Sequence, residues 1–194
     1  MRINNVITPV SSFLSVEKDT SIIMSELLKN QRLKKLLFYN TKDALHRPDL
    51  TTEQTVMLPG NHIKILPKIV VDKTLQTYLI VKFNTFRPNV RNSEFRDNII
   101  EFDIVCHFDQ WTLEDFQQRA FRIAAEIDTM FNKKHLTGIG VLQFVAGDPF
   151  VLTDEFGGFC LRYKAIHGEE DKTPMPTPEQ EQLLMDTYYP GLEF

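Results

Sequence analysis

Cysteine, tryptophan and glycine are scarce in this sequence, which holds two cysteines, one tryptophan and eight glycines among 194 residues. Cys106 and Cys160 lie in segments where apolar and polar residues alternate, so we expect two buried free thiols. A disulfide would require the two predicted strands to be neighbours, and nothing in the sequence demands one. Two cysteines without closely spaced histidines cannot form a cysteine-based zinc site.

Long apolar runs are also missing. No stretch approaches the roughly 20 apolar residues of a membrane-spanning helix. Residues 1–6 contain one basic residue and no apolar run of signal-peptide length. We therefore expect a protein that neither spans a membrane nor carries a secretion signal, and that acts inside a cell or in a virus particle.

The motifs of the common nucleotide-binding and hydrolytic sites are absent. Gly138 and Gly140 form a motif too short for a phosphate-binding loop, and they precede a predicted strand rather than a helix. There is no Gly-x-Ser-x-Gly motif. The histidines are scattered without the spacing of metal ligands, at His46, His62, His107, His135 and His167. We expect no catalytic site, no bound metal and no cofactor.

Apolar residues are nevertheless plentiful and periodic, at 42% of the chain with fifteen phenylalanines. This composition is typical of a chain that folds around one core. The spacing predicts helix, strand, strand, helix, strand and strand over residues 21–38, 77–85, 98–108, 112–131, 141–145 and 159–166. It indicates an α+β fold: a mostly antiparallel sheet covered on one face by a long helix, with an N-terminal helical segment. We expect one domain over residues 1–167 and an extended acidic C-terminal arm over residues 168–194.

The long predicted helix begins at Thr112, which is expected to be its N-cap. Its apolar residues recur at i, i+4, i+7, i+8, i+11 and i+15, as Phe116, Ala120, Ile123, Ala124, Ile127 and Phe131. We expect this stripe to cover the strand face that carries Ile100, Phe102 and Ile104, while Glu101 and Asp103 face the other way.

The remaining segments have weaker patterns. Residues 1–16 indicate an extended arm or first strand, and the first helix is expected to break at Asn30. Residues 39–66 are punctuated by proline, glycine and asparagine, which predicts an irregular segment with room for a short strand at 63–66. The run 147–149, Gly-Asp-Pro, predicts a turn.

Charge is distributed unevenly along the chain. Residues 1–96 have a net charge of +7, residues 97–167 of −5, and residues 168–194 of −6, which together give −4. Opposite charge at the two ends suits head-to-tail contact between identical subunits. Two unrelated solvated faces would show the same imbalance.

The segment 86–97 is basic and the C-terminal arm is acidic. Three arginines with phenylalanines nearby could bind nucleic acid, but the overall acidic charge argues against nucleic acid as the principal partner. Binding of the basic segment 86–97 to an acidic surface of a neighbouring subunit fits equally well. The acidic arm ends in apolar residues that could anchor it on a partner. The candidate subunit-interface residues are Arg87, Arg91, Arg96, Glu169, Glu170, Asp171, Tyr188, Tyr189 and Phe194.

One cluster has an enzyme-like composition. Glu101, Asp103, His107 and Asp109 lie on or just after one strand and could hold Mg²⁺, as in metal-dependent nucleases. Such a site also needs a nearby lysine and a second acidic element. The alternative is the solvent face of a half-exposed strand or the inner wall of a ring, and we favour this structural interpretation.

Three runs in the second half of the chain resemble a known family. They are residues 122–128 (RIAAEID), 136–142 (LTGIGVL) and 158–163 (GFCLRY). Their sequence and order are similar to those of tail-completion or tail-terminator proteins of long-tailed phages, and the similarity covers roughly residues 75–167. The N-terminal 70 residues and the acidic arm are longer than the family pattern, which leaves a head-closure ring or another neck adaptor as alternatives.

The resemblance implies a virion protein at the phage neck, made in the host cytoplasm, with no catalytic residues. Proteins of that family form hexameric rings that cap the tail tube and join it to the head. The implied partners are therefore further copies of the chain, neighbouring neck and tail-tube proteins, and DNA only as passing cargo. An acidic lumen would let DNA slide through, because like charges reduce adhesion.

Overall fold

The computed structural model describes residues 12–69, 76–88, 96–136 and 139–166. Its helices are α1 (Ser12–Lys29), α2 (Gln31–Phe38), α3 (Thr52–Val56), α4 (Leu58–Asn61) and α5 (Arg119–Phe131). Short 3₁₀ turns are η1 (Ala44–His46), η2 (Phe108–Gln110) and η3 (Glu114–Phe116). The strands are β1 (Ile63–Ile65), β2 (Tyr78–Pro88), β3 (Arg96–His107), β4 (His135–Leu136), β5 (Gly140–Val151) and β6 (Phe156–Ile166).

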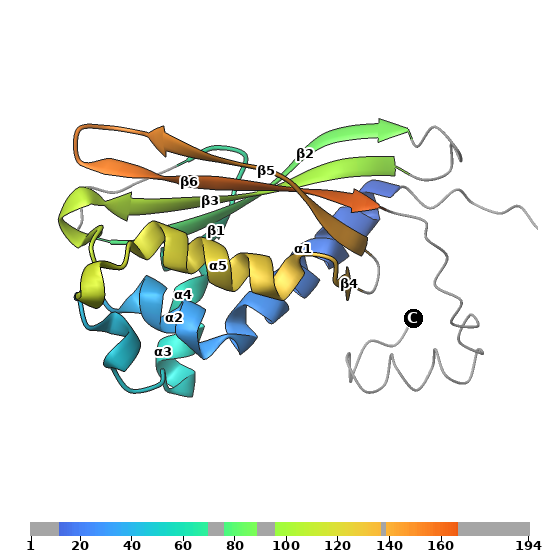
Figure 1. Cartoon of the computed structure of the whole chain (residues 1–194). Helices are drawn as coiled ribbons and strands as arrows, with labels where there is room; N and C mark the ends of the chain where they lie inside the picture. The colour runs from blue at the N-terminus through green and yellow to red at the C-terminus, as the bar shows by residue number, and fades with distance from the viewer. Residues whose placement is uncertain (1–11, 70–75, 89–95, 137–138, 167–194) are drawn as a thin grey trace, which may run out of the picture.

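The strands form one six-stranded sheet in the order β1-β2-β3-β6-β5-β4. Every neighbouring pair is antiparallel except β1 with β2. Helices α1, α2 and α5 lie against one face of this curled sheet (Figure 1). The α+β class and the helix-covered, mostly antiparallel sheet predicted from the sequence are therefore confirmed. Among the helices that the structure describes, none is both long enough and apolar enough to cross a membrane.

The main core lies between α5 and the centre of the sheet. Ile123, Ile127 and Phe131 of α5 are fully buried in one cluster with the apolar face of β3. The rings of Phe102 and Phe131 stack with centroids 5.0 Å apart, and Tyr163 meets Phe102 edge-on at 5.8 Å. The predicted cover of β3 by this helix is confirmed, and the alternation along β3 explains why its carboxylates point away from the core.

The two cysteines are both free and buried, as expected. Strands β3 and β6 are neighbours, but Cys106 belongs to the core under the helices whereas Cys160 is paired in register with Asp103 on the opposite face. Side chains on opposite faces of a sheet cannot approach to bonding distance. A disulfide is therefore excluded because the two cysteines lie on opposite faces of the sheet, although their strands are adjacent.

The first helix begins earlier than the sequence predicted. The expectation of an extended segment is wrong for residues 12–16, which belong to α1, while residues 1–11 lie outside the described part. The hydroxyl of Thr20 donates to the carbonyl of Val16 at 2.7 Å within the helix. The break at Asn30 is confirmed: its side chain caps α2 by accepting from the N–H of Leu33 at 3.0 Å. The short strand expected near residues 63–66 is also present, as β1.

The prediction of a helix from Thr112 is wrong, because α5 begins at Arg119. Residues 112–118 form a small hairpin, in which the N–H of Leu113 donates to the carbonyl of Gln117 at 2.7 Å. Leu113 is buried there, whereas Phe116, predicted as a core residue, is 96% exposed. The helical spacing of Phe116 is thus a coincidence, since the chain reverses direction before α5.

The predicted turn at residues 147–149 is also wrong. Strand β5 continues to Val151, and the chain turns at residues 152–155, where Leu152 and Thr153 donate from their backbone N–H groups to the carbonyl of Phe156. Gly147 is instead a close-packing position, because a Cβ there would lie 2.8 Å from the ring of Phe159. The glycine serves the packing of β5 on β6 and not a turn.

Candidate functional site

The sheet face opposite the helices has an apolar part and a charged part. Tyr78, Ile80, Val105 and Phe156 are buried in a small apolar cluster on this face. Further along the same strands lies a row of charged side chains, here called the charged row: Lys82, Glu101, Asp103, Asp148 and Arg162. It contains two of the carboxylates that the sequence singled out, Glu101 and Asp103.

The register of the strands builds the charged row. Lys82 of β2 is directly opposite Glu101 of β3, and Glu101 is directly opposite Arg162 of β6. Residues paired in this way share a face and lie close enough to interact. Lys82 Nζ is 3.2 Å from Glu101 Oε2, Arg162 Nε is 2.9 Å from Glu101 Oε1, and Arg162 Nη1 is 2.5 Å from Asp148 Oδ2. Asn84 donates a further hydrogen bond to Glu101 at 2.7 Å.

Asp103 is the most deeply placed carboxylate of the row. Its side chain is 3% exposed and its Oδ2 lies 2.5 Å from Lys82 Nζ, whose side chain is 15% exposed. Burial alone would lower the pKa of Lys82, but its bonds to Asp103 and Glu101 outweigh that effect and the pKa is raised. Burial likewise opposes ionisation of Glu101, yet Arg162 and Lys82 outweigh it and lower the pKa of this carboxyl. The carboxylate of Glu101 and the ammonium group of Lys82 are therefore held in their charged forms at neutral pH.

Three potential cation ligands meet in the row. The ligand atoms of Glu101, Asp103 and Cys160 all lie within 4.8 Å of one another. Burial, followed by the neighbouring Asp103, raises the pKa of the Cys160 thiol to about 12, so the sulfur is protonated at neutral pH. Lys82 is ion-paired to both carboxylates and Arg162 to Glu101, so both carboxylates already have cationic partners. A metal ion could bind here only by displacing the Lys82 ammonium group.

The structure therefore assembles a different cluster from the one predicted. Asp109 lies in η2 beyond the end of β3 with its side chain 79% exposed, and its N–H is bound by Nδ1 of His107 at 3.1 Å. Neither residue belongs to the group of clustered ligands around Asp103. Sequence reasoning missed Lys82, Cys160 and Arg162, because only the register of β2 and β6 on β3 brings them to the carboxylates.

The candidate interface residues lie largely outside the described part of the chain. Arg87 is on β2 and exposed, opposite Asp97 in the register. Arg96 begins β3, and Arg91 lies outside the described residues. The same is true of the residues proposed in the C-terminal arm, Glu169, Glu170, Asp171, Tyr188, Tyr189 and Phe194. Their contact with a neighbouring subunit stays a prediction.

A second surface feature, which the sequence did not indicate, lies just before α5. Asp115 and Phe116 both have positive φ, 56° and 58°, and the N–H of Gln117 closes the turn by donating to the carbonyl of Glu114 at 3.2 Å. We call residues 114–116 the aromatic turn. Turns with two positive φ values favour asparagine and glycine, and a bulky residue there is strained by about 1–2 kcal/mol. Phe116 adopts this strained backbone conformation although its side chain is almost fully exposed to solvent.

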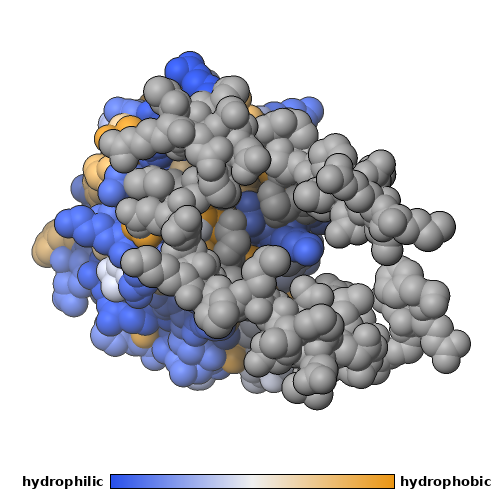
Figure 2. Space-filling model, turned by 90° about the vertical axis from the view of Figure 1, so that its right-hand side faces the viewer, coloured by the Kyte–Doolittle hydropathy of each residue, from blue (hydrophilic) through white to orange (hydrophobic). Residues whose placement is uncertain are grey.

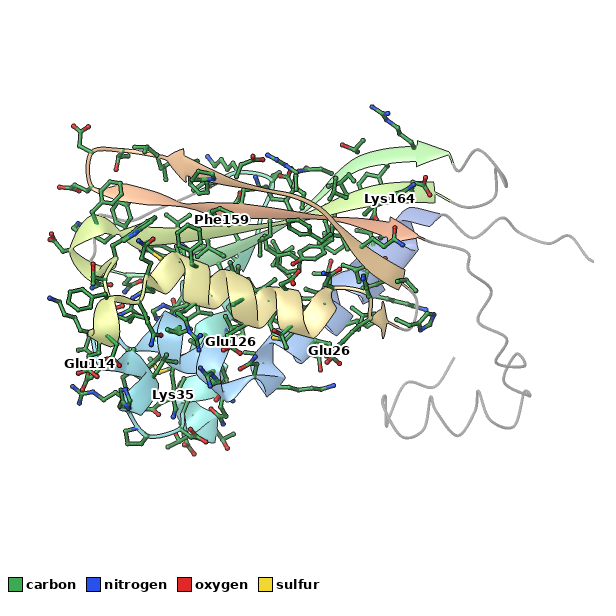
Figure 3. The ribbon with its side chains drawn as sticks, viewed as in Figure 1. Glu26, Lys35, Glu114, Glu126, Phe159 and Lys164 are labelled. Carbon is green, nitrogen blue, oxygen red and sulfur yellow. The ribbon has the colours of Figure 1, made fainter. Side chains whose placement is uncertain are left out.

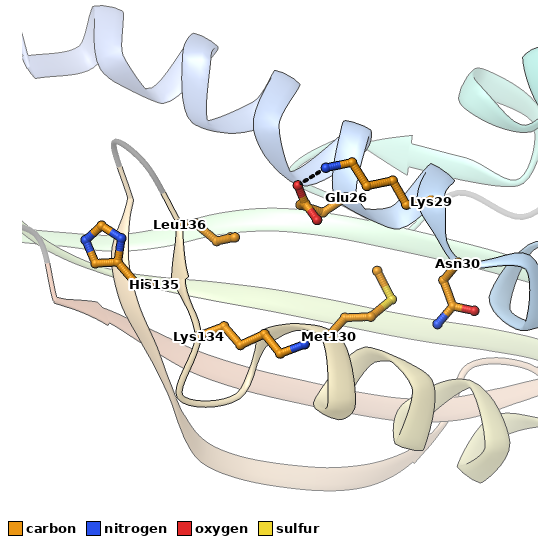
Figure 4. Close-up of a pocket in the computed structure, with 7 residues that line it drawn as sticks. All are labelled: Glu26, Lys29, Asn30, Met130, Lys134, His135 and Leu136. Atoms are coloured by element: carbon orange, nitrogen blue, oxygen red, sulfur yellow. Dashed lines mark hydrogen bonds and ion pairs between the residues drawn. The ribbon is translucent and has the colours of Figure 1, made fainter. Parts of the chain in front are cut away.

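A cleft of about 530 Å³ lies at the other end of α5, here called the α5 cleft. The end of α1 faces the turn after α5 and β4 across it, with Met130 between them (Figure 4). Viewed from this end, the described surface is largely hydrophilic with smaller apolar areas (Figure 2). The residues that line the cleft are Glu26, Lys29, Asn30, Met130, Lys134, His135 and Leu136.

Comparison with known proteins identifies a family. No curated protein matches this sequence significantly. The family model called YomW matches residues 30–165, which is well over half of the chain and includes all of the described sheet except the last residue of β6. YomW is a phage-type family, which agrees with a phage origin. The chain belongs to the YomW family.

Proposed function

We propose that this chain is a structural subunit of a phage particle that forms a ring at the head-tail neck, as a tail-terminator or tail-completion protein. Two arguments support a phage structural role: membership of a phage-type family, and the resemblance of residues 122–128, 136–142 and 158–163 to tail-completion proteins. Its partners would be further copies of itself, six in the ring, together with neck and tail-tube proteins. DNA would pass through as cargo.

The observation that carries the proposal is the amount of apolar surface left in water. Monomeric proteins rarely expose contiguous apolar patches, and such patches mark contact with other proteins. Here exposed apolar residues occur on the aromatic turn, on α5, on β5, in η2, after β1 and at the end of α3. They are Val56, Met57, Leu66, Phe108, Phe116, Phe121, Phe144, Val145 and Val151.

Strand β5 adds a second reason. Its partner on the outer side, β4, pairs only with Gly140 and Val141. The backbone of Leu142 and the N–H of Phe144 still bond to residues 132–134. Beyond Phe144 the outer edge of β5 has no strand partner within the described residues, and Val145 and Val151 on it are exposed. An unpaired apolar edge readily joins another chain, and a solitary protein would normally protect it. Assembly with further subunits gives this edge a partner.

The ring is tested with the full-length chain by mass photometry and negative-stain electron microscopy. A single closed species with a central hole is expected. In a phage that encodes the chain, its loss should leave heads and tails that do not join. A chain that stays monomeric at every concentration and is absent from purified particles would contradict the proposal.

A metal-dependent nuclease is the second candidate, because Glu101, Asp103 and Cys160 offer clustered ligands with Lys82 beside them. The ion pairs of Lys82 with both carboxylates disfavour it, and Asp109 does not join the cluster. Incubation with plasmid DNA and Mg²⁺ or Mn²⁺ separates the two functions, since only the nuclease would cleave.

A further inference from the structure

The aromatic turn and the α5 cleft lie at opposite ends of the same helix. Phe116 comes three residues before the first residue of α5, whereas Met130 and Leu136 lie at and beyond its end. A helix of 13 residues is about 20 Å long, so Phe116 cannot reach the cleft of its own chain. Figure 3 shows Glu114, which belongs to the turn, and Glu26, which lines the cleft, toward opposite ends of α5. Any contact between the two features must join two copies.

Phe116 has no stabilising role in the single chain that would account for its conformation. It is 96% exposed at φ 58°, next to Asp115 at φ 56°. Strained residues held out on a rigid turn are typical of binding sites, where the surrounding structure maintains them for contact. The small hairpin closed by Leu113 and Gln117 provides that rigidity. The two residues before Phe116, Glu114 and Asp115, are exposed acids, and Glu114 lies 3.5 Å from Nε2 of His46.

The α5 cleft has the complementary character. Met130 and Leu136 are partly buried within it, and methionine adapts its shape to an inserted apolar group. Lys29, Lys134 and His135 are exposed around them. Lys29 is paired with Glu26 at 2.5 Å, whereas Lys134 has no ion pair among the described residues. The cleft therefore offers two apolar side chains, and the charges that line it are the Glu26–Lys29 ion pair and Lys134, which leave a net positive charge.

We propose that Phe116 of one subunit inserts into the α5 cleft of the next, with Glu114 and Asp115 facing Lys29 and Lys134. The cleft volume of about 530 Å³ accommodates a phenyl ring. Opposite charge on the two surfaces orients the approach and excludes turn-to-turn pairing. Because different surfaces of the two copies meet, the contact is head-to-tail, and repetition closes a ring if the rotation between copies allows it. This inference rests on the proposed ring and names the contact that builds it.

The first test is Phe116→Gly in the full-length chain. The concentration at which half of the chains are assembled should rise at least tenfold, as measured by mass photometry. The unfolding midpoint of the dissociated chain should not fall, because glycine adopts a positive φ without strain. Glu53→Ala is the control: Glu53 is also exposed, but it lies on α3, outside both surfaces and outside the set of exposed apolar residues. Its assembly should be unchanged.

The second test exchanges charge between the two surfaces. A variant with Glu114→Lys and Asp115→Lys, and another with Lys29→Glu and Lys134→Glu, should each fail to assemble alone. Mixed in equal amounts they should assemble. The basic turn of the first variant then meets the acidic cleft of the second, and the acidic turn of the second meets the basic cleft of the first. Circular dichroism and the unfolding midpoint check that both variants are folded.

The outcomes separate this contact from the ring itself. If the wild-type chain forms rings, and Phe116→Gly and both charge variants do so at the same concentrations, the contact is overturned and the ring stands. If the mixture does not assemble while each variant alone is folded and monomeric, the charge pairing is overturned. A wild-type chain that never self-associates overturns both.

Discussion

The guanidinium group of Arg119 donates a hydrogen bond from Nη1 to the backbone carbonyl of Leu36 at 2.7 Å, and so joins the start of α5 to the last turn of α2. The same group donates to the carbonyls of Tyr39 at 2.9 Å, Thr41 at 2.7 Å and Gln110 at 2.9 Å. The side chain is fully buried. Burial lowers the pKa of Arg119, yet the carbonyls at the C-terminal end of α2 carry the partial negative charge that stabilises a cation.

Arg119→Ala is therefore expected to cost about 3–5 kcal/mol in the free energy of unfolding, because four buried or partly buried carbonyls lose their donor and a large void is left. Arg119→Lys should recover only part of this, since one ammonium group cannot reach carbonyls on both segments. Chemical denaturation measures both. Arg122→Ala on the same helix is the control and should cost less than about 1 kcal/mol, because Arg122 is only partly buried with a distant partner, Glu126 at 3.8 Å. Equal losses at the two positions would contradict the anchoring role of Arg119.

The contrast between Ile127 and Phe116 tests the corrected start of α5. Ile127→Ala should cost about 2–5 kcal/mol, because Ile127 is fully buried under β3. Phe116→Gly should instead stabilise the isolated chain by about 1 kcal/mol, because it relieves a positive φ at an exposed position. Urea denaturation of the monomeric forms measures both changes. A loss at Phe116 as large as that at Ile127 would place Phe116 in the core after all.

Asp19 should make stability depend on pH. It is 1% exposed, and burial raises its pKa from 3.8 to about 6. A carboxyl with a higher pKa in the folded chain binds its proton more tightly there, so the free energy of unfolding should fall as the pH rises from about 4 to about 6. Asp19→Asn removes this loss and should stabilise the protein at pH 7 by about 2 kcal/mol, with little effect at pH 4. Thermal unfolding across this pH range is the measurement, and an equal effect at both pH values would contradict it.

Asp103 and Lys82 should behave as a coupled buried pair. Asp103→Asn leaves the ammonium group of Lys82 with less compensation and should cost about 1–3 kcal/mol. Adding Lys82→Met should recover part of that loss, because the uncompensated charge is gone. Denaturation of both single variants and the double variant gives the coupling energy. Additive effects of the two substitutions would show that the pair contributes no coupling.

The charged row is also expected to be structural and not catalytic. The double variant Glu101→Gln, Asp103→Asn should keep its fold, as judged by circular dichroism, and neither it nor the wild type should cleave plasmid DNA with Mg²⁺. Metal-dependent cleavage by the wild type that disappears in this variant would overturn the structural interpretation and favour the nuclease.

The C-terminal arm, residues 168–194, is expected to serve assembly. A chain truncated after His167 should remain folded but form rings less readily, because the acids at residues 169–171 and the apolar residues near the end would be missing from the contact with a neighbour. Mass photometry and thermal unfolding are measured together. A lower melting temperature with normal rings would show an arm that folds back on its own domain.

Local pattern determined the central sheet and its helical cover. Alternation along β3 assigns Phe102 to the core and Asp103 to the opposite face, because each residue in a strand points opposite to its neighbours and burial of one face leaves a single register. The spacing of Ile123, Ile127 and Phe131 indicates a helix with one apolar stripe for the same local reason. These features need only residues close in sequence, and the structure confirms them.

Tertiary structure decided where α5 begins and what surrounds the carboxylates. Local spacing places Phe116 in the apolar stripe of the helix. It cannot reveal that Arg119 fixes the position where α5 begins, because the hydrogen-bond partners of Arg119, the carbonyls of Leu36 and Thr41, lie about 80 residues away in the sequence. The carboxylates of Glu101 and Asp103 were visible in the sequence, but Lys82 and Arg162 join them only through the pairing of separate strands. Long-range pairing therefore turned a possible cation site into a row of ion pairs, and the hairpin before α5 left Phe116 exposed in water.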